Sequence, residues 1–186
     1  MRAKNRKLTL GIDIDNVIAK TDKKIREIIR NTYGIDLTQE DITVYNYHKC
    51  GISRQQERDV LNIFHKKECK DVELVRGAKS SLSILGESYK VIIVTSRDLS
   101  SRKATEHWLK AKAIRYGSLI FENRKHKTGV KFHYFIEDRW KHALKLAKAG
   151  TKVLLFNYPW NLSRPEHPNI RRVNSWKEIV MLISGT

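Results

Sequence analysis

The chain has 186 residues, 40% of them hydrophobic, which suits one compact domain with a buried core. Its 37 lysines and arginines face 20 aspartates and glutamates, and the formal charge of +17 favours phosphorylated or polyanionic partners. No apolar run is long enough to cross a membrane, and the basic residues 1–7 lead into a stretch interrupted by acids, unlike a signal peptide. We therefore expect a cytoplasmic protein that has no membrane partner and, with only two cysteines, no disulfide framework.

Short apolar runs rich in β-branched residues alternate with helical patterns along most of the chain. The expected strands, of which the last is the weakest, are 8–14, 90–95, 118–121, 134–136, 153–156 and 170–173. Apolar residues at helical spacing predict helices through 80–85, 101–113, 140–147 and 176–183. This alternation predicts the α/β class, as a doubly wound parallel sheet with helices on both faces. The functional crevice of such a sheet lies beyond the carboxyl ends of its strands.

Residues 19–75 interrupt this alternation, because they contain no convincing strand. Amphipathic helices are expected at 21–34 and around 60–64, separated by a polar and aromatic stretch at 41–47. We interpret this segment as a small helical cap inserted after the first strand, so that residues 1–18 and 76–186 form the core. The alternative is that 21–34 is the first crossover helix of an ordinary sheet.

The first strand ends in two carboxylates, Asp13 and Asp15, which point to the same side of an extended chain. Such a pair repels, so a fold retains it where a cation lies between the two, or where one carboxylate attacks and the other moves protons. Two later strands end in the polar runs Thr95-Ser96-Arg97 and Glu137-Asp138-Arg139. In a parallel sheet these groups meet in one crevice, where they supply the parts that phosphoryl transfer to a carboxylate needs.

Four segments occur in the order of the motifs of the haloacid dehalogenase-like (HAD) superfamily of phosphohydrolases, which the chain therefore resembles. They are Asp13-Ile14-Asp15-Asn16-Val17, Val94-Thr95-Ser96, Lys127 and Ile136-Glu137-Asp138-Arg139. The later stretch 143–161, which ends in Pro159-Trp160-Asn161, is similar to the 5′(3′)-deoxyribonucleotidase branch of that superfamily. The resemblance covers residues 8–18 and 77–162 and implies a HAD-like Rossmannoid core.

The resemblance implies that Asp13 is a nucleophile that forms an aspartyl-phosphate. It implies that Asp15 protonates the leaving oxygen and then deprotonates the hydrolytic water. The groups implied in phosphate binding are Thr95, Ser96 and Lys127, with Lys125 and Lys103 as rivals for the lysine. Arg97 follows the two hydroxyls, so we expect it either to contact the phosphate or to form a surface salt bridge.

The implied cofactor is Mg²⁺, which prefers oxygen ligands and retains water molecules. The implied ligands are the side chains of Asp13 and Asp138 and the backbone carbonyl of Asp15, with Glu137 as a possible further ligand. The chain departs from the family at Asn16, where a glycine is usual, but asparagine tolerates left-handed backbone. It also departs at Thr21, near a position where nucleotidase relatives often carry an aromatic side chain.

The implied activity is Mg²⁺-dependent hydrolysis of phosphomonoesters, and we favour a 5′-nucleotidase that acts on nucleoside monophosphates. A phosphatase for another small phosphoester, such as a sugar phosphate, remains an alternative. So does a nucleic-acid-binding or polynucleotide end-processing protein that uses the +17 charge. Because the lysines are spread along the whole chain, a solvated basic surface is the simpler interpretation.

The helical segment contains further candidates with weaker patterns. A four-ligand zinc site could form from His48, Cys50, His65 and Cys69, although their spacing matches no strong zinc motif. The simpler interpretation is buried cysteines and surface histidines. Tyr45, Tyr47 and Phe64 are candidates for the floor of a base pocket, or for ordinary core. Trp160 and Asn161 are expected to shape the wall of the crevice.

Overall fold

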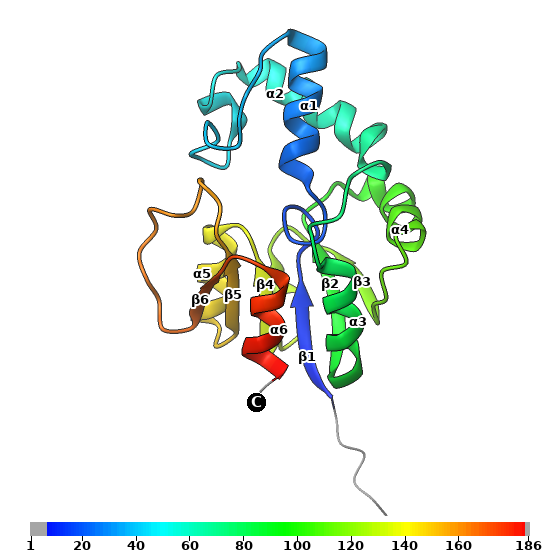
Figure 1. Cartoon of the computed structure of the whole chain (residues 1–186), viewed down its shortest axis with the longest axis vertical. Helices are drawn as coiled ribbons and strands as arrows, with labels where there is room; N and C mark the ends of the chain where they lie inside the picture. Colours follow the sequence, from blue (N-terminus) through cyan, green and yellow to red (C-terminus); the bar gives the residue numbers. More distant parts are fainter. Residues whose placement is uncertain (1–6, 185–186) are drawn as a thin grey trace, which may run out of the picture.

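Six parallel strands form the centre of the structure, a computed structural model that describes residues 7–184 except the side chain of Lys127 (Figure 1). Their order across the sheet is β3-β2-β1-β4-β5-β6, so β1 and β4 lie side by side in the middle. The predicted α/β class and parallel sheet are confirmed. The strands are β1 (Leu8–Ile12), β2 (Tyr89–Thr95), β3 (Ser118–Phe121), β4 (Tyr134–Glu137), β5 (Lys152–Phe156) and β6 (Ile170–Val173).

Helices fill the connections at the places where the apolar periodicity indicated them. They are α1 (Thr21–Tyr33), α2 (Arg54–Lys66), α3 (Ala78–Ser88), α4 (Arg102–Ala111), α5 (Trp140–Lys148) and α6 (Trp176–Ser184). The described chain also has four short 3-10 turns, η1 (Tyr47–Lys49), η2 (Glu68–Lys70), η3 (Leu99–Ser101) and η4 (Lys125–Lys127). Strand β1 ends two residues earlier than expected, because the chain turns sharply after Ile12 and Asn16 adopts a left-handed φ of 59°.

The central strands bury apolar side chains on both faces of the sheet. In β2, Val91 and Ile93 belong to the core under α3 and α6, whereas Ile92 and Val94 belong to the core under α5. Alternation of this kind follows from the two-residue repeat of a strand. A strand that is buried on both faces has apolar residues at successive positions, which is typical of parallel sheets.

Strand β1 passes through the most crowded part of this sheet at Gly11. A Cβ atom at this position would lie 2.2 Å from Cδ2 of Phe135 and 2.8 Å from Cδ1 of Phe132. The two phenylalanine rings pack edge to face, with centroids 5.1 Å apart. Only glycine therefore leaves room for this aromatic pair directly below the first catalytic candidates.

Helices α1 and α2 stand beyond the carboxyl ends of the strands and pack on each other, rather than along a face of the sheet (Figure 1). The incoming and outgoing chains of this segment lie side by side, because Lys20 N donates to Glu73 O at 2.8 Å and Val75 N donates to Ile18 O at 2.8 Å. This placement differs from that of a crossover helix. The exact division into a cap at 19–75 and a core stays a prediction.

No helix within residues 7–184 combines the length and apolar character needed to cross a bilayer. Both cysteines, Cys50 and Cys69, are free thiols.

The crowding at Gly11 predicts that Gly11→Ala destabilises the protein by about 3 kcal/mol, the upper end of the usual cost of overpacking. The measurement is urea-induced unfolding followed by circular dichroism. Gly86→Ala is the matched control, because a Cβ at this position in α3 meets no atom within 4 Å. The control should be neutral or stabilising by about 0.4–1 kcal/mol. Equal unfolding midpoints for the two variants would contradict this account of the aromatic pair.

Candidate active site

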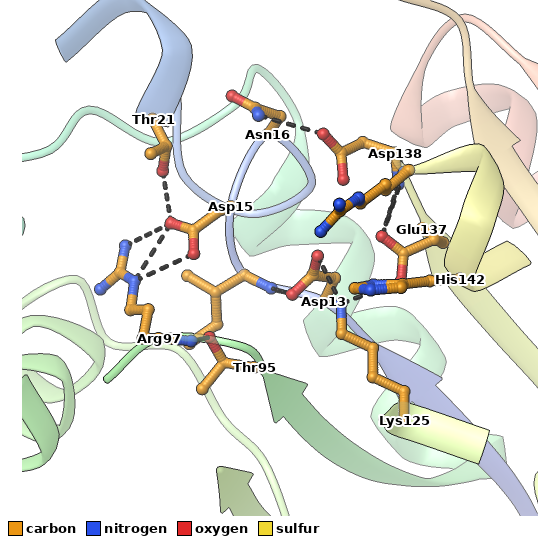
Figure 2. Close-up of polar contacts among 12 residues, drawn as sticks. Asp13, Asp15, Asn16, Thr21, Thr95, Arg97, Lys125, Glu137, Asp138 and His142 are labelled. Carbon is orange, nitrogen blue, oxygen red and sulfur yellow. Dashed lines mark hydrogen bonds and ion pairs between the residues drawn. The ribbon is translucent and has the colours of Figure 1, made fainter. Parts of the chain in front are cut away.

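Three buried carboxylates meet at the carboxyl ends of the two central strands (Figure 2). Asp13 directly follows β1, Glu137 ends β4 and Asp138 comes next, while the pairing of Ile12 with Ile136 sets the two strand ends level. One carboxylate oxygen from each residue lies within 4.8 Å of the others. Within the described residues this is the only group of three or more His, Cys, Asp or Glu side chains placed to hold a metal ion.

One lysine partly neutralises this carboxylate trio. Lys125 Nζ lies 2.6 Å from Asp13 Oδ2 and 2.9 Å from Glu137 Oε2, and its side chain is 1% exposed. The lysine that we had predicted, Lys127, has a side chain that lies outside the described part of the structure. The contact with the nucleophile candidate is made by its rival Lys125, two residues earlier on the turn η4.

The pKa values of the three carboxyl groups shift in different directions because their partners differ. Burial raises the pKa of Asp13 and of Asp138 well above its usual range, and the neighbouring carboxylates reinforce the effect on Asp138. Burial also disfavours the charge on Glu137, but Lys125 and His142 together outweigh it and lower the pKa of that group. Asp138 Oδ1 is buried without a hydrogen-bond partner. A cluster of oxygen donors with excess negative charge and one unsatisfied oxygen fits a hard divalent cation such as Mg²⁺.

Asn16 connects this trio to the first helix of the cap. Its Nδ2 donates to Asp138 Oδ2 at 3.0 Å, and its Oδ1 accepts from the backbone N–H of Asp22 at 2.7 Å. Asn16 lies between β1 and α1, and its backbone there has a left-handed φ of 59°. Asparagine, which replaces the glycine usual in the family at this position, therefore supplies side-chain hydrogen bonds that glycine cannot form.

The backbone at Asp138 is fixed from the opposite side by the loop after β5. Its carbonyl accepts from Asn161 Nδ2 at 2.7 Å and from Trp160 Nε1 at 3.2 Å. Arg172 in turn donates to Asn161 Oδ1 at 3.1 Å. Trp160 and Asn161 thus shape the wall of the crevice, as the sequence indicated, by holding one of its acids.

Asp15 lies near the trio, but its carboxylate turns away toward Arg97 (Figure 2). Arg97 Nη2 and Nε donate to Asp15 Oδ1 at 2.8 and 3.1 Å, and Thr21 Oγ1 donates to the same oxygen at 2.6 Å. Burial opposes the charge of Asp15, yet Arg97 outweighs it and lowers the pKa of that carboxyl. A carboxylate in this orientation does not join the trio, so its predicted metal contact would come from its backbone carbonyl.

The guanidinium of Arg97 is itself enclosed. Its side chain is 0% exposed, and it lies between the rings of Phe64 from α2 and Trp108 from α4, at 5.4 and 5.6 Å from their centroids. The ion pair with Asp15 therefore has a fully buried guanidinium and a half-buried carboxylate, and it is not the surface salt bridge that the sequence left open. Direct contact between Arg97 and phosphate stays a prediction.

The two hydroxyls after β2 occupy different environments. Thr95 is fully buried, and its Oγ1 accepts from the backbone N–H of Arg97 at 3.2 Å. Ser96 is exposed and faces the cavity beside Asp15. Of the two, Ser96 is the hydroxyl that an incoming ligand can reach.

A cavity of about 340 Å³ separates the cap helices from these strand ends. Its lining includes Asp15, Ser96 and Arg97 from the core. The side chains that line it from the cap include Ile42, Tyr45, Asn46, Tyr47, Glu57, Leu61, Phe64 and His65. The predicted acid Asp15 and the predicted aromatic residues therefore face one space.

The aromatic candidates have unequal roles. Phe64 is core, with 1% exposure, and Tyr47 is held by a hydrogen bond from its hydroxyl to Asp22 Oδ1 at 3.0 Å. Tyr45 is 38% exposed, and the guanidinium of Arg139 lies 4.1 Å from its ring centroid. Tyr45 is thus the side chain of the three that is most accessible to a ligand.

The four possible zinc ligands are not brought together. His48 Nδ1 lies 2.5 Å from Glu57 Oε2, and Cys69 Sγ donates to the backbone carbonyl of His65 at 3.4 Å. Cys50 Sγ points to the carbonyl of Val44 at 3.6 Å. His48, Cys50 and Cys69 thus each meet a different local partner.

Two contacts of the site have no signal in the sequence. His142 Nδ1 lies 3.6 Å from Glu137 Oε2, one turn into α5, and Thr105 accepts from Arg97 Nη1 at 3.3 Å. Both residues sit within ordinary helical patterns. Only the packing of α4 and α5 against the strand ends brings them to the acids.

Buried acids at the carboxyl ends of a parallel sheet, below a helical segment, define a hydrolase of the HAD class. The fold is similar to a haloacid dehalogenase-like family hydrolase of Streptococcus pneumoniae, with a TM-score of 0.66 and 13% identity over 95% of this chain and 98% of that one. It is also similar to the Bacillus subtilis protein YfnB bound to magnesium, with a TM-score of 0.62 and 12% identity over 96% and 99% of the two chains. At these identities the likeness shows the fold alone.

Residues 6–185 match the family described as 5′ nucleotidase, deoxy (Pyrimidine), cytosolic type C protein, and the chain belongs to this family. The Bacillus subtilis protein YqfW is 34% identical over 184 residues, which cover 96% of this chain and 94% of YqfW. A nucleotidase of Clostridium acetobutylicum is 28% identical over 181 residues, 95% of this chain and 93% of that protein. The chain is therefore a phosphoester hydrolase of the HAD superfamily, as its motif order indicated.

The opposite pKa shifts of Asp138 and Glu137 predict opposite effects on the stability of the metal-free protein. A raised folded-state pKa means that the folded state binds the proton of Asp138 more tightly than the unfolded state does. The contribution of Asp138 to the free energy of unfolding therefore falls as pH rises above the unfolded-state pKa of this group. Asp138→Asn should therefore raise the melting temperature at pH 7 in EDTA. Addition of Mg²⁺ should raise the melting temperature of this variant less than it raises that of the unchanged protein.

Glu137→Gln is the contrasting variant. In the unchanged protein the pKa of Glu137 is lower in the folded state than in the unfolded state. The charged carboxylate of Glu137 therefore stabilises the fold at pH values above the unfolded-state pKa, and this contribution is lost as pH falls. Removing the charge at pH 7 should cost about 3 kcal/mol, the scale of breaking a buried ion pair. Scanning calorimetry of both variants checks the signs. A destabilised Asp138→Asn protein in EDTA would show that the trio is not electrostatically strained.

Proposed function

We propose that the chain is a Mg²⁺-dependent 5′-nucleotidase that hydrolyses nucleoside monophosphates through an aspartyl-phosphate on Asp13. The observation that carries the proposal is the placement of Asp13 between Lys125 and two further acids, with Asp15 beside it at the cavity. The small partner implied is a phosphorylated nucleoside. The cytosolic description of the family supports the cytoplasmic location that we expected.

In the first step a carboxylate oxygen of Asp13 attacks phosphorus, and the bond from phosphorus to the ester oxygen breaks. Asp13 Oδ1 already accepts from the backbone N–H of Ile14 at 2.8 Å, and Oδ2 pairs with Lys125. These two contacts fix the carboxylate before substrate arrives. Fixed orientation of this kind removes much of the entropic cost of attack.

Asp15 is the group that moves protons in both steps. It gives its proton to the leaving ester oxygen and later takes one from the water that attacks the aspartyl-phosphate, which regenerates the Asp13 carboxylate. In the resting structure Arg97 keeps Asp15 ionised, the form that the second step needs. A phosphate dianion beside Asp15 opposes the charge of Arg97 and raises the pKa of the carboxyl, which favours the acid form for the first step.

The remaining contacts to phosphate come from the core. Lys125 supplies positive charge at Asp13, and Ser96 presents a hydroxyl at the cavity. These groups lie in a buried site, where each charge has a larger effect than it would have in water. Thr95 acts by holding the backbone of Arg97 rather than by contacting phosphate.

Asp13 and Asp138, with the backbone carbonyl of Asp15 and with Glu137 close by, are the residues that would hold Mg²⁺. When bound, the ion offsets the charge of the acids and of the phosphate. Asn16, Trp160 and Asn161 keep Asp138 in place for this role. The fit rests on the unsatisfied Asp138 Oδ1 and on the oxygen-only donor set.

The cavity supports a nucleoside as the group attached to phosphate. It has a volume of about 340 Å³, an accessible aromatic ring at Tyr45 and polar side chains at Asn46 and Glu57. Aromatic surface with a few polar groups is typical of pockets for small organic ligands. A phosphate-release screen over nucleotides and sugar phosphates tests this step, and a higher kcat/KM for sugar phosphates would contradict it.

The mechanism predicts different losses at the two aspartates of the first motif. Asp13→Asn should abolish hydrolysis of nucleotides and of p-nitrophenyl phosphate, because no nucleophile remains. Asp15→Asn should lower kcat on nucleotides by about 10²–10⁴, the scale of general acid–base catalysis. Since p-nitrophenol leaves without a proton, Asp15→Asn should accumulate phosphoenzyme from that substrate. Acid quenching of ³²P-labelled reactions measures it, and phosphoenzyme in Asp13→Asn would refute the assignment.

The site geometry predicts that Lys125 is the lysine that catalysis needs. Lys125→Met should lower kcat/KM by about 10²–10³, the cost of removing one preorganised donor. Lys103→Met and Lys127→Met are matched controls that remove the same charge from the two rival positions, and both should retain near-native kcat/KM. Circular dichroism checks that each variant is folded. A larger loss in Lys127→Met than in Lys125→Met would reverse the assignment.

A further inference from the structure

Acidic residues are distributed unevenly along the chain, although lysines are not. Residues 123–186 hold 13 lysines and arginines and four acidic residues, two of which, Glu137 and Asp138, are buried in the active site. The segment 19–75 holds 11 basic and 10 acidic residues, and some of its lysines meet carboxylates, as Lys20 and Lys23 do at Glu73. Unbalanced positive charge is therefore concentrated in the last third of the chain.

Much of this charge lies on the outer face of α5. Lys141, Lys145 and Lys148 are spaced by four and three residues, which places them on one stripe of the helix. All three are exposed, while Ala143 and Ala147 face the sheet. None of these three lysines forms an ion pair with any side chain in the described range 7–184.

Helix stability does not explain the whole stripe. A cation is favourable in the last turn of a helix, where Lys145 and Lys148 lie, but unfavourable at its start by about 0.3–1 kcal/mol. Arg139 occupies the N-cap position of α5 and Lys141 its first turn, and no acidic residue accompanies them there. These two charges work against the helix dipole, which indicates a role outside the helix.

A groove beside the start of α5 adds aromatic and basic side chains to this surface. It has a volume of about 560 Å³ and lies between α5 and the chain around β6, lined by Trp140, Pro165, Glu166, His167, Pro168, Ile170, Arg171 and Arg172. Arg139, next to Trp140, lines the active-site cavity and stacks on Tyr45. The lysine stripe, this groove and the mouth of the cavity thus adjoin one another at the start of α5.

We propose that this α5 surface, made of Lys141, Lys145 and Lys148 with Arg171 of the groove, binds the phosphate backbone of single-stranded nucleic acid. Basic side chains that follow a backbone, next to aromatic rings on which bases stack, are what such binding uses. Seven residues of helix separate Lys141 from Lys148, or about 10 Å, which exceeds the reach of a single phosphate. The outer face of α5 carries no large exposed apolar side chain of the kind that inserts into a lipid interface.

The test measures binding of a single-stranded DNA oligonucleotide that is labelled at an internal base and has no terminal phosphate, so that catalysis plays no part. Fluorescence anisotropy gives the affinity between 50 and 200 mM salt for the unchanged protein and for Lys141→Gln/Lys145→Gln/Lys148→Gln. The slope of log K against log salt should decrease in magnitude by about 2 in the triple variant, because each lost backbone contact removes about 0.7.

The matched control is Lys79→Gln/Lys90→Gln/Lys177→Gln, which removes three exposed lysines from α3, β2 and α6 and lowers the net charge equally. It should keep the native slope, and both triple variants should keep the native kcat/KM on mononucleotides. An equal change of slope in the two variants would overturn the proposal, because binding would then follow net charge alone. So would absence of salt-dependent DNA binding, binding to anionic lipid vesicles in place of DNA, or a selective fall in mononucleotide kcat/KM in the α5 variant.

Discussion

The mutual repulsion of three buried carboxylates is the constraint on which the site depends. Asp13, Glu137 and Asp138 place their oxygens within 4.8 Å of one another, and Lys125 neutralises only part of their charge. Desolvated like charges at this distance are unfavourable, and the pairing of β1 with β4 brings them together at the ends of the two strands. This repulsion lowers the stability of the metal-free protein. In the proposed mechanism the same arrangement binds a divalent cation and presents an ionised nucleophile.

Two acids of the site, Asp138 and Asp15, are each connected through one neighbouring residue to the helices after β1. Asn16 joins Asp138 to the start of α1, whereas Arg97 joins Asp15 to the ring of Phe64 in α2. A movement of the cap helices would therefore change the surroundings of both acids.

The positive charge of the protein has two different physical roles. Lys125 and Arg97 are buried and fully paired with carboxylates, so their charges serve the geometry of the active site. The lysines of α5 are solvated and unpaired among the described residues, so their field extends into solvent. Net charge alone does not distinguish these roles, because both kinds of residue contribute equally to the formal +17.

The sequence by itself determined the strand and helix order and the positions of Asp13, Asp15 and Asp138, because the apolar periodicity and the polar strand ends are local patterns. It did not show that Lys125 contacts Asp13 and Glu137, since the direction of a side chain on a short 3-10 turn depends on what packs against that turn. Nor did it show that Arg97 is enclosed by Phe64 and Trp108, or that the α5 lysines lack carboxylate partners. Those contacts join residues that are distant in the chain, so only the tertiary structure decided them.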